Sequence, residues 1–443
     1  MQKGTAKILF DNEAARSVVA SAGRISTTQG TALSVYAKSG DVEKDLKLIK
    51  KVLSSGHKSV MEHQMFSIAF DDVSVLAEQF MIEHRLASYT VKSRRYVDHS
   101  GAGYIVPEGI AGAALAMYCK GMNSLFALYT KLCDAGIPKE DARFVLPYSF
   151  RSNFYMTLNG REMIRLVAEM LYGRGSVTPE LKHLGMQLKD QLEKLYPGIL
   201  DGEEKGISRY AQEAPAGDIG CAGEKVIESV LTDLGDPVEA LTQAMAFSGR
   251  FGDDDGDYVT ELNMMKLVRD ARPRELEYIN ARFIVKNVSL ASVTHFTRHR
   301  MLSLMVPNVV RALEKGGYVV PESIRADEAL LAEYEQAFAE QARLANELRA
   351  MGMNEAEMGY LALAGHVIDI MIGMNGRELL HFLKLRTCTR AQWEIRSAAK
   401  QMLSQLRETC DDIFWVYGPS CLVDGRCPEG RLSCGKPEFR QER

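Results

Sequence analysis

Two short segments bring cationic and proton-carrying side chains together. Arg298-His299-Arg300 places three of them in a row, and His84-Arg85 repeats two of them directly after Glu83. Arginine binds phosphate oxygens through paired N–H groups, and a neighbouring histidine can neutralise or donate. These segments therefore suggest a site for a phosphorylated ligand. Surface ion pairs are the plainer structural alternative.

The residues after His84-Arg85 add hydroxyl groups to the guanidiniums. Residues 88–96 read Ser-Tyr-Thr-Val-Lys-Ser-Arg-Arg-Tyr, and hydroxyls beside two guanidiniums suit a phosphate or a nucleotide. No base for Ser93 is evident, so spacing alone does not support it as a nucleophile. In the second segment Asn308 stands at the place of Ser93, and that segment cannot repeat the same chemistry.

A third polar segment lies upstream, at residues 56–63. His57, Glu62 and His63 could suggest a metal site. Their spacing is not that of His-Glu-x-x-His, and no third ligand is obvious. We therefore favour a polar turn that binds a ligand and predict no metal site.

Arginines recur near the carboxyl end, around Trp393. If the segment is helical, Arg386 and Arg390 lie four residues apart on one face. Guanidiniums beside an aromatic ring suit an anionic ring ligand. A solvated basic helix face is the alternative.

The tail holds four cysteines, with gaps of ten, five and six residues: Cys410, Cys421, Cys427 and Cys434. These gaps differ from the two-residue clips that are common in zinc sites. Four thiolates could still hold zinc or a cluster. Free thiols or an occasional disulfide are the simpler expectation.

Three landmarks occur twice, in the same order. His84-Arg85 recurs 215 residues later, Gly-Tyr-Ile-Val-Pro-Glu at 103–108 recurs as Gly-Tyr-Val-Val-Pro-Glu at 317–322, and Asn-Gly-Arg-Glu at 159–162 recurs unchanged at 375–378. Three pairs at nearly constant offset indicate two tandem copies of one domain. We expect domains at 1–200 and 221–443, joined by a glycine-rich linker near 198–223.

Hydrophobic spacing predicts the elements that carry these residues. Short apolar stretches at 65–70 and 281–285 read as strands. Two long helices should end before Gly136 and Gly352. Another should run from Thr178 to Pro197, with a stripe of leucines that is most simply core packing.

The composition is that of an ordinary globular protein. The 443 residues include 46% hydrophobic and 25% charged residues, and the net charge is −4. Disordered and fibrous classes are excluded, and no general attraction to nucleic-acid polymers or anionic membranes follows. No apolar run is long enough for a membrane span, and the amino terminus lacks the apolar core of a signal peptide. We expect a cytoplasmic protein.

These segments resemble the flavin-dependent thymidylate synthases. That family carries the pattern Arg-His-Arg-x-x-Ser-x-x-x-x-Ser-x-Arg-Tyr, and residues 83–96 match it except at Glu83. The family's upstream loop, middle helix and carboxyl-terminal signature are matched at 56–63, 142–147, 375–386 and 391–396. The match covers most of both repeats, and each repeat thus resembles one family domain.

The resemblance implies an α/β (α+β) fold in which an antiparallel sheet is flanked by long helices, present twice. It also implies reductive methylation of dUMP to dTMP. Methylenetetrahydrofolate would supply the one-carbon unit, FAD the hydride, and NADPH would reduce the flavin. This would make the chain a methyltransferase and a flavoprotein of dTMP biosynthesis.

Site residues are carried over from the family position by position. The cofactor-binding set would be His57, Ser59, Glu62, His84, Arg85, Asn159, Arg161, Arg298, His299, Arg300, Asn375, Arg377 and His381. Ser93, Arg95, Arg143 and Arg386 would bind dUMP. Ser93 and Arg386 would be catalytic, since Arg386 matches the arginine that polarises the uracil and favours its N3-deprotonated form.

Each repeat departs from the family pattern, and the losses are largely complementary. The first repeat has Met170 at the place of Arg386 and Val91 where the family usually has Glu. The second has Tyr278 at the place of His63, Asn308 at that of Ser93 and Gly359 at that of Arg143. The family is a homotetramer with sites between subunits. We therefore expect a homodimer that forms a pseudo-tetramer, with composite sites drawn from both repeats.

The sequence leaves three alternatives. Glu83 and Val91 touch the expected nucleotide pocket, so another pyrimidine nucleotide could be the substrate. The chain could also be an inactive relic that binds flavin or nucleotide. An interaction scaffold with a metal held by the tail cysteines is the third alternative.

Overall fold

The computed structural model describes residues 3–12, 14–207, 217–253 and 256–435. The chain forms two compact units. Unit 1 comprises Met1–Gly220 and Glu322–Ala364, and unit 2 comprises Cys221–Pro321 and Gly365–Arg443. The segment 322–364 thus belongs to the second repeat by sequence and packs within unit 1.

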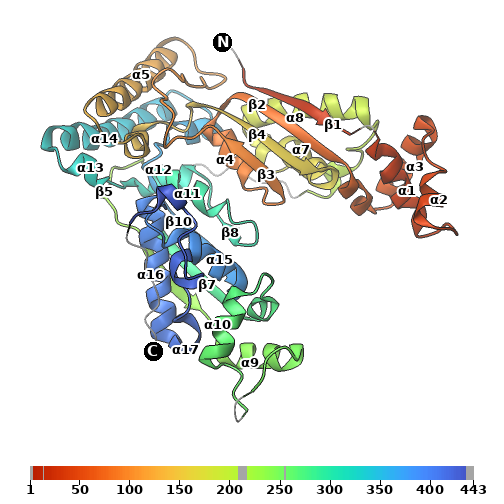
Figure 1. The fold of residues 1–443 in the computed structure, drawn as a ribbon. Coiled ribbons are helices and arrows are strands. Elements are labelled where there is room, and N and C mark those ends of the chain that lie inside the picture. Colours follow the sequence, from red (N-terminus) through yellow and green to blue (C-terminus); the bar gives the residue numbers. More distant parts are fainter. Residues whose placement is uncertain (1–2, 13, 208–216, 254–255, 436–443) are drawn as a thin grey trace. The chain divides into compact units, whose positions relative to one another are not determined.

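Unit 1 is built on a four-stranded antiparallel sheet (Figure 1). Its spatial order is β1 (Thr5–Asp11), β2 (Met65–Ser74), β4 (Arg151–Asn159) and β3 (Ala87–Val91). Alternate residues of β4 are buried, as expected for a sheet with one face on a core. Helices α7 (Gly160–Leu171) and α8 (Pro179–Leu195) pack against the sheet with their apolar faces.

The amino-terminal helices complete the sheet-containing part of unit 1. They are α1 (Ala15–Ile25), α2 (Ala32–Tyr36), α3 (Val42–Ser54) and the short α4 (Val75–Ile82). Asp45 of α3 is buried and pairs with Arg24 at 2.9 Å, which satisfies its charge.

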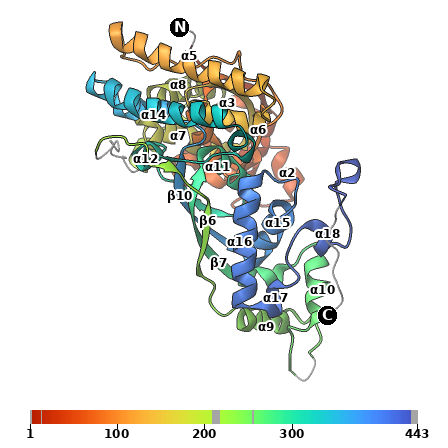
Figure 2. The same ribbon diagram turned by 90° about the vertical axis from the view of Figure 1, so that its left-hand side faces the viewer.

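Two long helices from the two repeats pair within unit 1 (Figure 2). They are α5 (Gly112–Asp134) and α14 (Glu328–Ala350). Gly121 permits the close approach, because a Cβ there would lie 2.4 Å from Cδ2 of Leu344. Short helices α6 (Lys139–Ala142) and α13 (Glu322–Arg325) flank the pair. Equivalent segments of the two repeats therefore share one core.

Unit 2 repeats the sheet of unit 1 strand for strand. Its order is β6 (Glu228–Asp233), β7 (Asn280–Ser289), β10 (Val367–Asn375) and β8 (Ser303–Met305), again antiparallel. Helices α15 (Gly376–Arg386) and α16 (Trp393–Thr409) correspond to α7 and α8. Smaller elements surround them: β5 (Gly223–Glu224), β9 (Gly317–Tyr318), α9 (Pro237–Ser248), α10 (Glu261–Arg269), α11 (Leu290–Phe296), α12 (Val310–Lys315), α17 (Asp411–Phe414) and α18 (Ser420–Val423).

Side-chain details are duplicated along with the sheets. Glutamine side chains of α8 bond the backbone of β1, where Gln187 Oε1 accepts from Ala6 N at 2.7 Å. Gln401 of α16 accepts from Ser229 N of β6 at 2.8 Å in the same way. These repeated contacts confirm the tandem duplication and the α+β class.

A second duplicated feature is a left-handed residue within a central strand. Asp72 of β2 and Asn287 of β7 have φ of 53° and 56°. Each backbone N–H donates to a side chain on the neighbouring strand, to Asn153 at 2.9 Å and to Asp369 at 2.8 Å. Asn and Asp tolerate this conformation better than most residues do. The register shift of both strands lies at this point.

The predicted strands and long helices are confirmed. The stretches at 65–70 and 281–285 lie in β2 and β7, and α5, α8 and α14 cover the three predicted helices. Gly136 and Gly352 follow α5 and α14 with positive φ, as a helix stop requires. Within the described ranges, no helix is long and apolar enough to cross a membrane. Much of the predicted linker, at 208–216, lies outside the described residues.

Candidate active site

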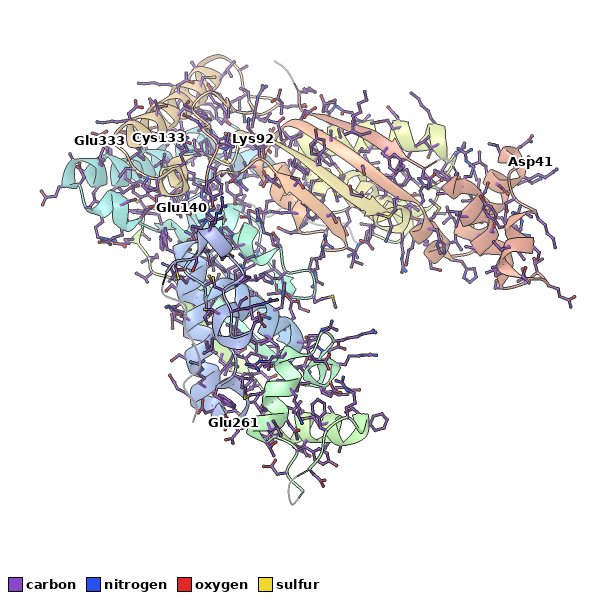
Figure 3. All side chains as sticks on the ribbon, viewed as in Figure 1. Asp41, Lys92, Cys133, Glu140, Glu261 and Glu333 are labelled. Atoms are coloured by element: carbon purple, nitrogen blue, oxygen red, sulfur yellow. The ribbon has the colours of Figure 1, made fainter. Side chains whose placement is uncertain are left out.

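Three of the four residues predicted to bind the nucleotide come together in unit 1, and the fourth, Arg386, lies in unit 2. The chain turns directly after β3, and Arg95 N donates to Ser93 Oγ at 3.2 Å. Arg95 Nε donates to Oε2 of Glu140 at 2.7 Å, while Arg143 Nε donates to the carbonyl oxygen of the same residue at 3.0 Å. Glu140, labelled in Figure 3, therefore joins the two arginines beside Ser93. Arg143 is buried, and Arg95 is partly exposed.

His99 supports this turn and is a residue that the sequence patterns miss. It is only 2% exposed, and its ring hydrogen-bonds the backbone of Ser93. Burial, with the cations of Arg94 and Lys92, lowers the pKa of His99 to about 4. His99 belongs to no recognised motif, and only its spatial position identifies it.

Arg94 has a structural role rather than a binding role. Its Nη2 donates to Oε1 of the buried Glu78 at 2.6 Å, and its guanidinium lies over the ring of Phe150. A buried carboxylate with a cationic partner is stabilised. Of the two adjacent arginines, Arg95 is the one whose side chain contacts Glu140, the residue that also holds Arg143.

The loop at 56–63 and the start of α7 form a second group in unit 1. His57, Ser59 and Glu62 are exposed. Arg161 Nη1 lies 2.8 Å from Oε1 of Glu62, and Asn159 caps α7 by accepting from Glu162 N at 2.9 Å. The structure thus brings Glu62 and Arg161 together at the amino end of a helix.

Close packing requires glycine at the second position of the Asn-Gly-Arg-Glu landmark in both repeats. A Cβ on Gly160 would lie 2.7 Å from the carbonyl oxygen of Met61, and a Cβ on Gly376 equally close to that of Leu276. Only glycine lets the helix start approach the preceding loop so closely. In unit 2, Arg377 then pairs with Glu277 at 2.7 Å, as Arg161 does with Glu62.

A cavity of about 520 Å³ opens beside this group in unit 1. Four cationic side chains line it: Lys58, Arg161, Arg165 and Arg174. Carboxylates balance part of the charge, since Glu203 pairs with Lys58 at 2.7 Å and Glu169 with Arg165 at 3.1 Å. Such a lining suits a ligand with phosphate groups.

His84-Arg85 follows α4 in unit 1. Nε2 of His84 lies 3.7 Å from Oε2 of Glu169, and the ring is largely buried. Burial, with the nearby Arg174 and Arg165, lowers the pKa of His84 to about 4. Glu83 replaces a cation of the family motif with a carboxylate, and this carboxylate pairs with Arg174 at 2.6 Å.

The equivalent group in unit 2 is the more complete one. His299 is buried, its Nδ1 lies 3.0 Å from Oε1 of Glu378, and Arg386 Nε donates to its Nε2 at 2.9 Å. His381 is exposed, and its ring lies 5.5 Å from that of His299. Burial, aided by Arg386 and His381, lowers the pKa of His299, and Glu378 opposes the shift. Asn375 caps α15 by accepting from Glu378 N at 2.9 Å.

The remaining predicted residues of unit 2 lie on its surface. Arg298 and Arg300 are exposed, whereas His299 between them is buried. The segment that carries Arg386 and Arg390 is not one helix, because α15 ends at Arg386 and Arg390 lies in the turn before α16, so the two arginines share no helix face. The side chain of Gln392 accepts from Glu394 N and Ile395 N there, which starts a new helix in a new direction.

The carboxyl-terminal cysteines show no common centre. Across the described ranges, no group of three or more His, Cys, Asp or Glu residues is arranged to hold a metal ion. All eight cysteines of the chain are free thiols. The metal-bearing scaffold thus gains no support.

Comparison with known proteins agrees with the two tandem repeats. The family model for the thymidylate synthase complementing protein matches residues 7–198 and 238–410. A flavin-dependent thymidylate synthase of Geobacter sulfurreducens is 35% identical over 190 residues, which cover 42% of this chain and 80% of that protein. One of Pyrococcus abyssi is 34% identical over 168 residues, covering 35% and 68%.

Two solved structures are similar to part of the chain. The UMP/dUMP methylase PolB from Streptomyces cacaoi, bound with 5-Br dUMP, has 23% identity and a TM-score of 0.39, covering 47% of this chain and 98% of its own. Thymidylate synthase X from Helicobacter pylori, with FAD and dUMP, has 20% identity and a TM-score of 0.37, covering 46% and 99%. Because the family model spans most of the sequence in two successive segments, the chain belongs to the flavin-dependent thymidylate synthase family and carries two copies of its domain.

Proposed function

We propose that the protein converts dUMP to dTMP, using bound FAD, NADPH and methylenetetrahydrofolate. The observation that carries this proposal is that the chain keeps both groups of residues expected to bind a uridine nucleotide. Ser93, Arg95 and Arg143 gather around Glu140 in unit 1, and Arg386 is held by His299 in unit 2. The curated relatives named flavin-dependent thymidylate synthase support the same activity.

The residues that would hold FAD fit a dinucleotide with two phosphates. In unit 1 the cationic cavity provides Lys58, Arg161 and Arg165. In unit 2, Arg377 and the exposed His381 occupy the equivalent helix face of α15. FAD, when bound, supplies the hydride. The chain's own task is to bind the ligands and to fix their orientation.

The nucleotide would be bound at its two ends by different chemistry. The guanidiniums of Arg95 and Arg143 suit the 5′-phosphate, because their N–H groups form a fork that matches phosphate oxygens. Ser93 adds a hydroxyl beside them. Arg386 would face the uracil ring, where a fixed cation stabilises the negative charge that develops during methylation.

We further propose that each site takes residues from both repeats of the assembled protein. The first repeat has Met170 at the place of Arg386, and the second has Asn308 and Gly359 at those of Ser93 and Arg143. Neither repeat keeps a complete set. A homodimer that forms a pseudo-tetramer would then hold two sites instead of four.

Tritium release from labelled dUMP, with FAD, NADPH and methylenetetrahydrofolate, tests this proposal. Ser93→Ala and Arg386→Ala should each lower turnover by about 100-fold or more, because both serve every site. Titration calorimetry with dUMP should give one site per chain. If either variant kept at least half of the activity, the composite site would be wrong. No conversion of dUMP by the wild type would refute the function itself.

One structural feature favours a second candidate, the methylation of another pyrimidine nucleotide. Glu83 replaces the first arginine of the family motif and forms an ion pair with Arg174 instead. A changed charge beside the expected pocket can change the preferred base or sugar. Comparing dUMP with UMP and dCMP in the same assay distinguishes the candidates. A flavin that NADPH bleaches and that no nucleotide and folate reoxidise would indicate an inactive relic.

We also propose a cytoplasmic location. The eight free thiols support this proposal, because structural disulfides are rare in reducing compartments.

A further inference from the structure

A chain of three side chains links α15 to the segment after α11 in unit 2. Glu378 Oε1 lies 3.0 Å from Nδ1 of His299, and Nε2 of His299 lies 2.9 Å from Nε of Arg386. Because the Nε–H of arginine can only donate, Nε2 of His299 is the acceptor. Nδ1 therefore carries the hydrogen and donates to Glu378. This arrangement defines one tautomer of a neutral imidazole.

Burial supports that protonation state. His299 is 2% exposed, and Glu378 is 7% exposed. Removal from water disfavours the imidazolium, and the adjacent guanidinium disfavours it further. A neutral, buried ring with a fixed tautomer is a rigid acceptor at one defined position.

We infer that His299 is a positioning residue that fixes the direction of the Arg386 guanidinium. Arg386 is the last residue of α15 and is partly exposed, so its long side chain would otherwise sample many rotamers. The bond at Nε holds the middle of the guanidinium, and Nη2 also approaches the carbonyl oxygen of His295 at 3.4 Å. The remaining N–H groups are then aimed in one direction.

The first repeat shows the same histidine without the arginine. His84 corresponds to His299, and Met170, fully buried, stands at the place of Arg386. Nε2 of His84 has no hydrogen-bond partner among the described residues, and Oε2 of Glu169 is 3.7 Å away. The acceptor is thus engaged only in the repeat that keeps the arginine, as expected if orienting that arginine is its task.

Two substitutions at position 299 separate orientation from simple packing. His299→Gln can place an amide oxygen near the position of Nε2, whereas His299→Asn can reach only towards Glu378 and leaves Arg386 without its acceptor. Lys384→Gln is the matched control. Lys384 lies on α15, two residues before Arg386, and the substitution removes its 2.7 Å ion pair with Asp424, which follows α18.

The first measurement needs no nucleotide. In protein labelled with ¹⁵N-arginine, the Nε–H resonance of Arg386, assigned by its loss in Arg386→Lys, should shift in His299→Asn. It should keep its wild-type position in Lys384→Gln and stay near it in His299→Gln. An unshifted resonance in His299→Asn would overturn the inference. If His299→Asn does not fold, a wild-type resonance in His299→Gln supports the inference and a lost one contradicts it.

The second measurement rests on the proposed function. His299→Asn should lower kcat for dUMP by about 10- to 100-fold with KM changed by less than about threefold, because misplacing one group by an ångström has effects of that size. His299→Gln should recover most of that loss. Equal losses in both variants would contradict positioning through Nε2. If the wild type does not turn over dUMP but the resonance behaves as expected, the proposed function fails and the positioning role stands.

Discussion

Arg95 places its Nε 2.7 Å from Oε2 of Glu140, so a guanidinium proposed to bind phosphate is paired with a carboxylate of its own unit. The pair is partly exposed, with 26% of the Arg95 side chain and 29% of the Glu140 side chain accessible. Glu140 also accepts from Arg143 Nε through its backbone carbonyl. A phosphate bound at Arg95, as proposed, would compete with this carboxylate, while the backbone of Glu140 holds the second arginine.

The first prediction follows from this competition. Glu140→Gln should tighten dUMP binding by roughly three- to fivefold, because a partly exposed ion pair contributes no more than about 1 kcal/mol. Titration calorimetry with dUMP measures the change. The control is Glu333→Gln, which removes the 2.5 Å ion pair with Lys131 elsewhere in unit 1. Weaker binding in Glu140→Gln would show that the carboxylate orients Arg95 for the ligand instead of competing with it.

The second prediction separates two roles of Asn375. Its side chain caps α15 at 2.9 Å, and it is also proposed to contact FAD. Asn375→Asp keeps the capping oxygen and adds a negative charge, which favours a helix amino terminus but repels a phosphate. We expect unchanged stability together with FAD binding weakened by about tenfold, the effect of roughly 1.4 kcal/mol.

The control for the cap is Asn375→Ala, which should lower the stability of unit 2 by about 1 kcal/mol. Both tryptophans, Trp393 and Trp415, lie in unit 2, so their fluorescence in urea follows that unit. Flavin absorbance during titration gives the affinity. FAD binding of wild-type strength in Asn375→Asp would remove this residue from the proposed cofactor site.

The third prediction concerns a carboxylate buried at the start of α16. Glu394 is fully buried, and its two oxygens accept from Ser289 N at 2.7 Å, Ser289 Oγ at 2.5 Å and Ser292 Oγ at 2.6 Å. Glu394→Ala leaves these donors unsatisfied, so unit 2 should lose at least about 3 kcal/mol. The control is Glu408→Ala on the same helix, because Glu408 accepts an exposed hydrogen bond from Ser404 Oγ at 2.9 Å.

Unit 1 contains an equivalent buried carboxylate, so the same substitution can be tested there. Glu180 accepts from Ser74 N at 2.7 Å and Ser74 Oγ at 2.5 Å. Glu180→Ala should destabilise unit 1 by a comparable amount, measured by amide exchange in β2. Wild-type urea transitions in Glu394→Ala would show that the serines find other partners.

Local sequence patterns predicted the helices and strands. They missed site residues that are brought to Ser93 only by the fold. Three repeated landmarks fix the duplication, and α8 follows from Thr178, Pro179 and a leucine stripe, because each signal lies within a few turns of chain. Glu140 and His99 belong to no motif. They become visible only when the fold brings them to Ser93.

Two other features depend on packing that no local pattern contains. The pairing of α5 with α14 joins residues about two hundred positions apart and assigns 322–364 to unit 1. The arginine spacing is a case in which a local pattern misled. Arg386 and Arg390 lie four residues apart, as on one helix face, but α15 ends at Arg386 and the cap at Gln392 starts a separate helix. Helical spacing of charged residues, without a buried stripe, is weak evidence for a continuous helix.

The last prediction concerns the pH dependence of unit 1. Glu357 is 2% exposed and accepts from Glu108 N at 2.8 Å. Burial, with the carboxylates of Glu108 and Glu180 nearby, raises the pKa of Glu357 from 4.5 to about 7. In the unfolded chain the group ionises near 4.5. Between these values the folded state retains a proton that the unfolded state has lost, so this stabilisation is complete below pH 4.5 and is lost as the pH rises towards 7.

Glu357→Gln should therefore remove this loss of stability at rising pH, because the amide cannot ionise and can still accept from Glu108 N. At pH 8 the variant should be more stable than the wild type by about 2 kcal/mol once solvent screening is allowed for, with little difference at pH 4.5. Amide exchange of α14, measured at both pH values, follows unit 1. Glu328→Gln, at the first turn of α14, is the control for lost charge. A difference that is the same at both pH values would mean that packing, and not ionisation of Glu357, sets the effect.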